Sequence, residues 1–206
     1  MSFVPAAGRA GLIGTYDATI RLTMRESRWR PAVAALAGSG VVVEVGAGTG
    51  TQSLELARSA AAVLAVEPDP SALSIARSKA DASRVRWLEG MADALPVESG
   101  SADAVVMTLM LHHLDGAGKR AALREAHRVL RASGRLIVAD WGVPFGPVPR
   151  AGMRALARID GEAGIRDHVA GRLPAFIEEA GFTAPQRHAR LGTLWGTLEL
   201  LTATRP

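Results

Sequence analysis

The sequence contains no cysteine. A disulfide-stapled secreted fold, a thiolate metal site and a cysteine nucleophile are therefore all excluded. Aromatic residues are also scarce: they make up 4 % of the chain, with Tyr16 as the only tyrosine. Because few rings are available to stack on bases, a nucleic-acid substrate is not expected.

Long hydrophobic runs are missing too. The longest, Val105 to Leu111, is far shorter than the roughly 20 residues that a membrane helix needs. Arg9 interrupts the N-terminal stretch before an apolar signal core can form, so no signal peptide is predicted. We expect a cytoplasmic, unprocessed protein.

The composition that remains is that of an ordinary folded domain. The 206 residues are 48 % hydrophobic and 21 % charged, which favours one globular domain. The net charge is +4 and the pI about 10.5. A high pI suggests nucleic acid or an anionic membrane as a partner, but we favour the simpler interpretation that an Arg-rich composition spreads its charge along the chain.

Short apolar runs alternate with stretches of helical spacing. Helices are expected at 50–59, 71–82, 119–131 and 173–180, and strands at 41–45, 62–67, 85–90, 102–111 and 134–140. Such alternation predicts a parallel sheet covered on both faces. Two final strands, 182–189 and 194–203, are separated only by 190–193, which permits a hairpin and no crossover helix. The predicted fold is α/β: an open, mostly parallel seven-stranded Rossmann-like sheet with helices on both faces and a C-terminal antiparallel hairpin.

The whole chain, 1–206, is interpreted as a single domain of four parts. They are an N-terminal helical arm (15–37), a ligand-binding core (41–140), an insertion that serves as a lid or substrate wall (141–172), and the last helix with the hairpin (173–206). The insertion is long for a connection and is predicted to carry a helix at 150–159.

The strongest chemical signal is VVVEVGAGTG, residues 41–50. Gly46, Gly48 and Gly50 occupy the turn from the first strand to the first helix, where glycine allows a tight turn and a close approach of a ligand to the backbone. Glu67 ends the next strand, 17 residues after Gly50. An acid at that place accepts hydrogen bonds from ribose hydroxyls. The glycines and Glu67 together predict an adenosine-type site.

The spacing argues against several adenosine ligands. Dinucleotide sites usually carry G-x-G-x-x-G, whereas this turn reads G-x-G-x-G, and no G-x-x-x-x-G-K-[ST] phosphate loop is present. With Tyr16 as the only tyrosine, the Tyr-x-x-x-Lys pair of short-chain dehydrogenases is not available. A nicotinamide cofactor is therefore disfavoured.

At this point the sequence resembles a known family, the class I S-adenosylmethionine-dependent methyltransferases. It is most similar to their ubiquinone/menaquinone C-methyltransferase-like (methyltransferase type 11) branch. Five ordered motifs carry the resemblance: EVGAGTG (44–50), VEPDPS (66–71), GMADALPVESGSADAVV (90–106), LHHL (111–114) and RVLRASGRLIVAD (128–140). They span about half of the chain in register.

The resemblance implies roles for particular residues. S-adenosyl-L-methionine would be the cofactor and S-adenosyl-L-homocysteine the product, with no metal. Glu44 would reach the amino end of the cofactor, Glu67 the ribose, and Asp93 the adenine. The full set of implied cofactor-binding residues is Glu44, Gly46, Ala47, Gly48, Gly50, Glu67, Pro68, Ala92, Asp93, Ala94, Thr108 and Leu109. Pro68-Asp69-Pro70 departs from the family, which usually has one proline there or none.

Methyl transfer from a sulfonium demands no particular catalytic residue, because orienting the acceptor supplies most of the effect. The candidates for a general base are His112 and His113, which follow the fourth strand, and we expect His113 to lie nearer the acceptor. The alternative is that one histidine packs on the cofactor and the other bonds a loop carbonyl. Asp140, at the end of the fifth strand, is interpreted as structural.

The expected acceptor is a small molecule or lipid. The chain lacks the Asn/Asp-Pro-Pro-aromatic motif of enzymes that methylate exocyclic amines of bases. Two other classes stay open: a non-catalytic S-adenosylmethionine-binding module, and a Rossmann NAD(P) oxidoreductase. The sequence predicts no oligomeric state.

Arginines recur at helical spacing in two flanking segments. They are Arg21, Arg25 and Arg28 in the arm, and Arg150, Arg154 and Arg158 in the insertion. Such helices are commonly surface helices whose other face packs on the core. The sharper hypothesis is that both segments close over a bulky apolar acceptor and make weak peripheral contact with an anionic membrane.

Overall fold

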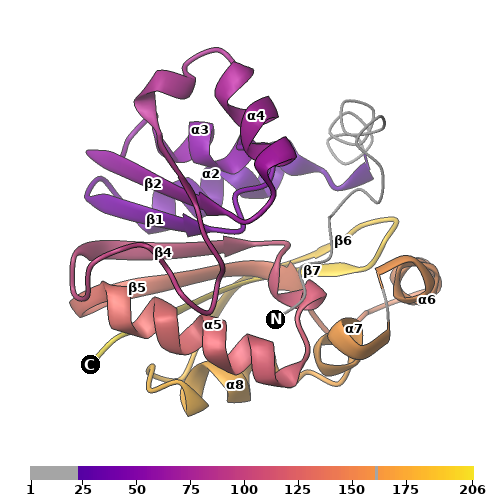
Figure 1. Cartoon of the computed structure of the whole chain (residues 1–206). Helices are drawn as coiled ribbons and strands as arrows, with labels where there is room; N and C mark the ends of the chain where they lie inside the picture. Colours follow the sequence, from indigo (N-terminus) through magenta and orange to yellow (C-terminus); the bar gives the residue numbers. More distant parts are fainter. Residues whose placement is uncertain (1–22, 161) are drawn as a thin grey trace.

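The computed structural model describes residues 23–160 and 162–206. Seven strands form one sheet in the order β3-β2-β1-β4-β5-β7-β6 (Figure 1). The five strands β1 to β5 pair in parallel, and β7 runs antiparallel between β5 and β6. Their bounds are Val41–Val45, Ala62–Glu67, Arg86–Glu89, Ala102–Thr108, Leu130–Trp141, Gln186–Gly192 and Thr197–Thr204 for β1 to β7. The predicted mostly parallel sheet with an antiparallel C-terminal hairpin is confirmed.

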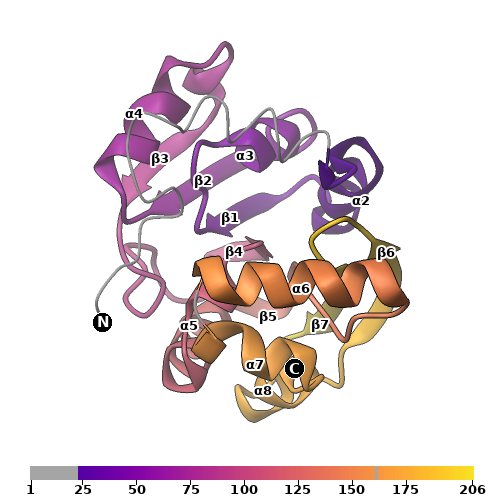
Figure 2. The same cartoon turned by 90° about the vertical axis from the view of Figure 1, so that its right-hand side faces the viewer.

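Helices cover both faces of the sheet and one edge. The α-helices α2 to α8 span Glu26–Ala37, Thr51–Leu56, Pro70–Ser78, Gly116–Val129, Pro147–Asp160, Glu162–Val169 and Leu173–Glu179. Two 3₁₀ turns, η1 and η2, span Ala82–Arg84 and Leu111–His113. Figure 2 looks onto the edge where the parallel strands end, and α6 crosses that edge in front of β4 and β5.

The central strands are buried on both faces, which explains their continuous apolar sequence. Val42 packs in one cluster with Val33 of α2. Val43 lies in a second cluster, on the other face of the sheet, with Leu123 of α5 and Phe176 of α8. Because neighbouring side chains of a strand point to opposite faces, Glu44 lies on the face that carries α2 and α3.

The fourth strand ends three residues earlier than predicted. β4 stops at Thr108, and Leu109 has a φ of 49°, in the left-handed region that leucine seldom adopts. The chain then forms η2, so the residues expected to finish the strand instead start a tight turn. This turn directs both histidines of η2 toward the carboxyl edge of the sheet.

The hairpin is shifted relative to its prediction. β6 begins at Gln186, directly after Pro185, which has no N–H to donate to a strand ladder. The reversal is made by Thr193 to Gly196, where the Thr193 hydroxyl accepts hydrogen bonds from the backbone N–H groups of Trp195 and Gly196. Side-chain bonding of this kind sets a turn that apolar patterning alone does not locate.

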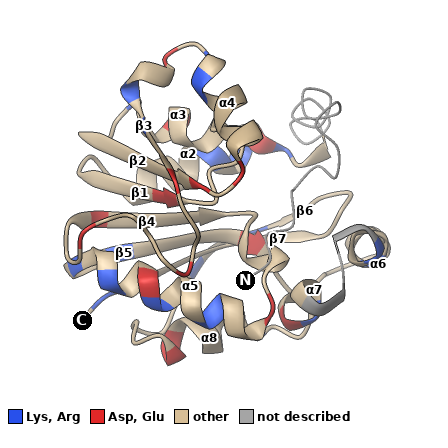
Figure 3. Ribbon diagram, in the orientation of Figure 1, with Lys and Arg blue, Asp and Glu red and all other residues tan. Residues whose placement is uncertain are grey.

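The two flanking segments also differ from their predictions. The insertion carries two helices, α6 and α7, where one was expected. Of the expected arm, α2 forms from Glu26 to Ala37, whereas 15–22 lie outside the described residues. Within the described residues no helix is long and apolar enough to cross a membrane. Lys and Arg are dispersed over the elements of the molecule (Figure 3).

Candidate functional site

The candidate site lies where the parallel strands end. β1 lies between β2 and β4 in the sheet, so the connections from β1 and β4 leave to opposite sides. Ligands of open α/β sheets bind in the crevice at such a point, outside the carboxyl ends of the strands. The glycine turn after β1 and Glu67 at the end of β2 both lie at this edge.

The glycines of the turn serve different purposes. A Cβ on Gly50 would lie 2.4 Å from the ring of Trp87, and one on Gly46 would lie 2.8 Å from the Cβ of Met110, so both are required for packing. Gly48 has a φ of 53° and nothing within 4 Å of the place where its Cβ would stand. The backbone at Gly48 is therefore bare toward open space, as a ligand-facing glycine should be.

Glu67 reaches across to this bare glycine. One oxygen of its carboxylate accepts a hydrogen bond from Gly48 N at 2.8 Å, and the other accepts from Asp69 N at 3.0 Å. Burial raises the pKa of Glu67, and these two N–H donors oppose the rise. A carboxylate offers about four lone-pair positions. Glu67 therefore keeps acceptor capacity for two more donors, such as a pair of ribose hydroxyls.

The two prolines beside Glu67 are explained by the helix that follows. Asp69 is the N-cap of α4, its carboxylate accepting from Ser71 N at 2.8 Å, and Pro70 is the first helical residue. Proline is favoured at that position because its fixed φ suits the helix and its missing N–H would have no partner. Pro68 lies between Glu67 and the cap, so the unusual Pro-Asp-Pro sequence restricts the backbone that leads from Glu67 into α4.

Glu44 is buried under the same turn with 1 % of its surface exposed. Its carboxyl group accepts hydrogen bonds from the Ser53 hydroxyl of α3 and, at 3.4 Å, from the Thr108 hydroxyl of β4. Burial raises the pKa of Glu44 to about 7, against the lowering effect of Ser53 and of the Arg30 charge. Ser53 and Arg30 were not singled out from the sequence. Near pH 7 the Glu44 carboxyl group can therefore be protonated or ionised beside the glycine turn.

The turn that holds Asp93 follows β3 at the same edge. Met91 and Ala94 form an isolated bridge that encloses Ala92 and Asp93, and Gly90 N donates to Glu67 O at 3.3 Å. The register of β2 and β3 sets Glu67 beside Glu89. The sequence-predicted acid at the end of β2 and the Asp93 turn are therefore neighbours.

His112 has a carboxylate partner. Its Nδ1 lies 2.7 Å from Asp140 Oδ1, and the second oxygen of Asp140 accepts from Leu111 N at 2.9 Å. Since a carboxylate accepts, Nδ1 of His112 carries the proton and Nε2 is the basic nitrogen. Burial alone would raise the pKa of Asp140, but the neighbouring His112 and His168 hold it below its usual value. Asp140 orients His112, a function that the sequence did not predict.

His113 lies in a different environment. Its ring centroid is 4.0 Å from that of His112. Burial, followed by the adjacent His112, lowers the pKa of His113 to about 3, despite the opposing effect of Asp140. Near neutral pH the ring is therefore uncharged and a weak base. Of the two histidines, the one preferred from the sequence is the one without a carboxylate to orient it among the interactions that the structure describes.

Two further buried polar residues join this region to the insertion. His168 of α7 contacts the carbonyl oxygen of Trp141 through Nδ1 at 2.6 Å, which leaves its Nε2 buried without a partner among the described residues. Lys119 of α5 donates to Leu114 O and Gly164 O at 2.7 Å each, and lies 3.3 Å from Asp167. Neither was singled out from the sequence, because their partners other than Leu114 lie 27 to 48 residues away in the chain.

The part of the chain that matches known proteins is the same strand and helix core that holds the candidate site. Residues 43–138 match the family model described as a methyltransferase domain. Demethylmenaquinone methyltransferase from Thermus thermophilus is 38 % identical over 92 residues, 44 % of this chain and 39 % of that protein. The chain spans about half the length of the curated relatives it matches.

Solved structures extend the likeness to the fold of most of the chain. The YcgJ protein from Bacillus subtilis has a TM-score of 0.69 at 18 % identity, covering 85 % of this chain and 97 % of that one. A geranyl diphosphate methyltransferase in complex with GPP and sinefungin has a TM-score of 0.69 at 17 % identity, covering 88 % of this chain and 79 % of that one. At these identities the likeness establishes the architecture alone.

Proposed function

We propose that this chain, which belongs to the class I S-adenosylmethionine-dependent methyltransferase family, transfers a methyl group from S-adenosylmethionine to a small-molecule or lipid-like acceptor. The observation that carries the proposal is the contact between the Glu67 carboxylate and Gly48 N at the carboxyl edge of the sheet. It joins an acceptor for ribose hydroxyls to a stretch of backbone that is open to a ligand.

The residues at this edge fit the cofactor in chemistry. Gly48 offers bare backbone, Glu67 keeps free acceptor capacity, and Glu44 carries a carboxyl group that ionises near neutrality beside the turn. In the proposal Glu67 holds the ribose and Glu44 the amino end. The Ala92-Asp93-Ala94 turn contacts the adenine, and Ala47, Gly50, Pro68, Thr108 and Leu109 complete the site. When bound, the sulfonium supplies an activated methyl group.

For the acceptor's proton we propose His112 as the general base. Asp140 fixes its ring orientation and its tautomer through the 2.7 Å contact, so that Nε2 is the ring nitrogen that would take a proton. The same carboxylate accepts from the backbone N–H of Leu111, which ties the base to the start of η2. His113, with a pKa lowered to about 3, would remain neutral and contribute shape.

The class of acceptor is supported by the relatives. One is a demethylmenaquinone methyltransferase, and one structural neighbour is a methyltransferase in complex with GPP. Both names describe apolar or part-apolar small molecules. The scarcity of aromatic side chains, 4 % of the chain, argues against base stacking and so favours such an acceptor over nucleic acid.

Ligand binding tests the proposal without knowledge of the acceptor. S-adenosylhomocysteine at 100 times its dissociation constant should stabilise the fold by about 2.7 kcal/mol through mass action, or roughly 5 to 10 °C in melting temperature. NAD at the same concentration should leave the melting temperature unchanged. Stabilisation by NAD alone would contradict the proposal, and methyl transfer from radiolabelled donor to acceptor mixtures separates an enzyme from a silent binding module.

A matched pair of glycine variants sharpens this test. Asparagine tolerates the left-handed region, so Gly48→Asn should keep the fold while its side chain enters the ligand's space, weakening S-adenosylhomocysteine binding at least tenfold. Gly100 has a φ of 69° and likewise nothing near its missing Cβ, but it lies in the turn before β4, at the opposite end of that strand. Gly100→Asn should bind normally. Equal affinities of the two variants by calorimetry would refute the assignment of Gly48.

A further inference from the structure

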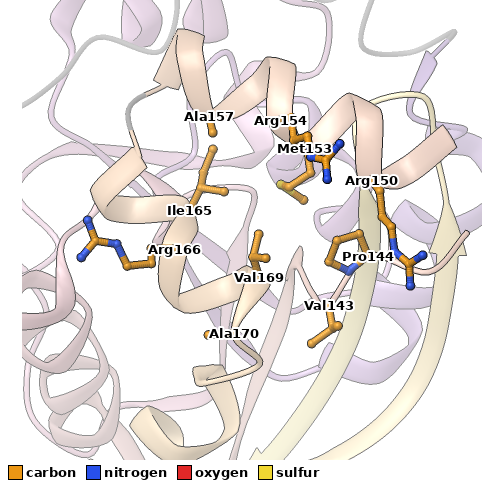
Figure 4. Close-up of a pocket in the computed structure, with 10 residues that line it drawn as sticks. All are labelled: Val143, Pro144, Arg150, Met153, Arg154, Ala157, Ile165, Arg166, Val169 and Ala170. Atoms are coloured by element: carbon orange, nitrogen blue, oxygen red, sulfur yellow. The ribbon is translucent and has the colours of Figure 1, made fainter. Parts of the chain in front are cut away.

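A pocket of about 600 Å³ opens between α6, α7 and the segment that follows β5 (Figure 4). Its volume is typical of sites that hold one small molecule. Met153 of α6 and Ile165 of α7 line it and are 3 % and 2 % exposed, so they form a recessed apolar floor. No residue assigned above to the cofactor lines this pocket.

The charged side chains that line the pocket are all positive. Arg150, Arg154 and Arg166 are among its lining residues, which include no acid. Among the side chains that the structure describes, none forms an ion pair with these three arginines. The nearby Arg190 differs, because it pairs with Glu199 at 3.0 Å. The pocket therefore combines an apolar floor with positive charge that has no described counter-charge.

The positions of two arginines on α6, both exposed to solvent, modestly favour an anion beside them. Arg150 is the fourth residue of α6, near the positive end of the helix dipole, where cations are disfavoured. Arg154 lies one turn further on, and like charges four residues apart on a helix repel. Figure 4 shows both side chains on the same side of the pocket. An anion at this place would relieve both effects.

Two of the exposed apolar side chains lie at the same pocket. The exposed large hydrophobic side chains of the described residues are Val143, Phe145, Val148, Val169 and Leu194. Val143 and Val169 line the pocket, and Phe145 and Val148 belong to the segment that leads into α6 and to its first turn. Leu194 lies against α6, with its carbonyl oxygen beside Gly152. Exposed apolar surface in one place marks a binding site more often than chance exposure does.

We propose that this pocket binds an amphipathic anion: a single molecule whose phosphate or carboxylate is held by Arg150 and Arg154 and whose apolar body lies against Met153 and Ile165. The recessed floor favours one molecule over a membrane surface, because a flat bilayer does not reach into a concave site. The inference is independent of the methyl-transfer proposal and of whether the ligand is the acceptor, a product or a regulator.

Decyl phosphate, used as a monomer below its critical micelle concentration, tests the inference by calorimetry on the full chain. We expect saturable binding that weakens as salt is raised, and no binding of the neutral 1-decanol at the same concentration. Arg150→Gln with Arg154→Gln should weaken binding about tenfold or more, because charge-assisted hydrogen bonds to the headgroup are lost. Arg158→Gln is the matched control: Arg158 lies on the same helix but outside the pocket, and its variant should bind as the wild type does.

A second variant tests the apolar part. Ala157→Trp should fill the pocket and abolish binding while circular dichroism and S-adenosylhomocysteine affinity stay unchanged. Equal binding of decyl phosphate by the wild type and the double arginine variant would overturn the inference. Binding to phosphatidylglycerol vesicles without saturable binding of the monomer would overturn it as well. Because S-adenosylhomocysteine is measured separately, failure here is distinguishable from failure of the methyl-transfer proposal.

Discussion

Glu44 couples the ionisation of one buried carboxyl group to the stability of the fold. Its folded pKa of about 7 lies above the unfolded value of 4.5. Between these values the folded state binds more protons than the unfolded state, so stability from protonated Glu44 is complete below about pH 4.5 and is lost as the pH rises toward 7. At one pKa unit per 1.36 kcal/mol the loss amounts to about 3 kcal/mol.

Glu44→Gln removes this titration while keeping an oxygen for the Ser53 hydroxyl. We therefore expect the stability of the variant relative to the wild type to improve by about 2.5 kcal/mol between pH 5 and pH 8. Urea unfolding of both proteins at the two pH values, without ligand, measures the difference. His113 and Asp140 have lowered pKa values and act in the opposite direction, but they are common to both proteins and cancel. Parallel pH dependence would show that Glu44 is ionised throughout.

The two histidines of η2 differ by one hydrogen bond, and substitution can separate their roles. In His112→Asn the amide nitrogen replaces Nδ1 as donor to Asp140 while the basic Nε2 is lost. If His112 is the base, turnover with a proton-losing acceptor should fall by about 10²- to 10⁴-fold, with S-adenosylhomocysteine affinity unchanged. His113→Asn should have a much smaller effect, because the lowered pKa of His113 makes it a weak base. An equal loss in both variants would remove the distinction.

At the scale of elements, the sheet was predictable because its signals are local. VVVEV and AVLAVE are continuous runs of buried strand residues, and the register β1–β2 pairs Val41 with Ala62 and Val45 with Val66 as consecutive parallel strands should. Where an element ends was predicted less well. Asp69 caps α4 as its sequence suggests, but β4 ends at Thr108, before a positive φ at Leu109 that no apolar pattern signals.

The residues of the candidate site likewise differ in how well the sequence predicted their placement. The placement of Glu67 beside the glycine turn was predictable, because the strand-end acid and the turn belong to one strand-helix-strand unit and meet at the same edge of the sheet. The pairing of His112 with Asp140 was not, since it joins η2 to the end of β5 across 28 residues and depends on the turn at Leu109. The preference for His113 came from the alternation of side chains and from the family resemblance, and Asp140 was interpreted as structural.

For the molecule as a whole, the segment 141–172 is more than a lid over a finished domain. Met153 and Ile165 belong to the same apolar cluster as Val42 of β1 and Trp141 of β5. A Cβ on Gly164 of α7 would lie 1.8 Å from His112 O, so α7 and η2 are in backbone contact. The insertion is part of the core, so deleting it would remove side chains against which the sheet packs.

Lys119 adds polar contacts to the apolar packing between the insertion and the core. Replacing Lys119 tests how much these contacts contribute to that attachment. Its side chain is 0 % exposed and binds Leu114 O, Gly164 O and Asp167 at once, linking α5, the segment after η2 and α7. Lys119→Met keeps the length of the side chain but leaves two buried carbonyls without their donor. We expect the free energy of unfolding to fall by about 2 to 4 kcal/mol.

The same substitution should speed hydrogen exchange at the amides of α7 far more than at those of β1 and β4, because α7 loses its polar anchor while the sheet keeps its own bonds. Arg124→Met is the control: Arg124 is exposed on the same helix, and its variant should differ from the wild type by less than about 0.5 kcal/mol. Urea unfolding and native-state hydrogen exchange measure the two effects. If Lys119→Met cost no more than Arg124→Met, or if exchange rose equally in α7 and the sheet, Lys119 would not be the anchor that joins the insertion to the core.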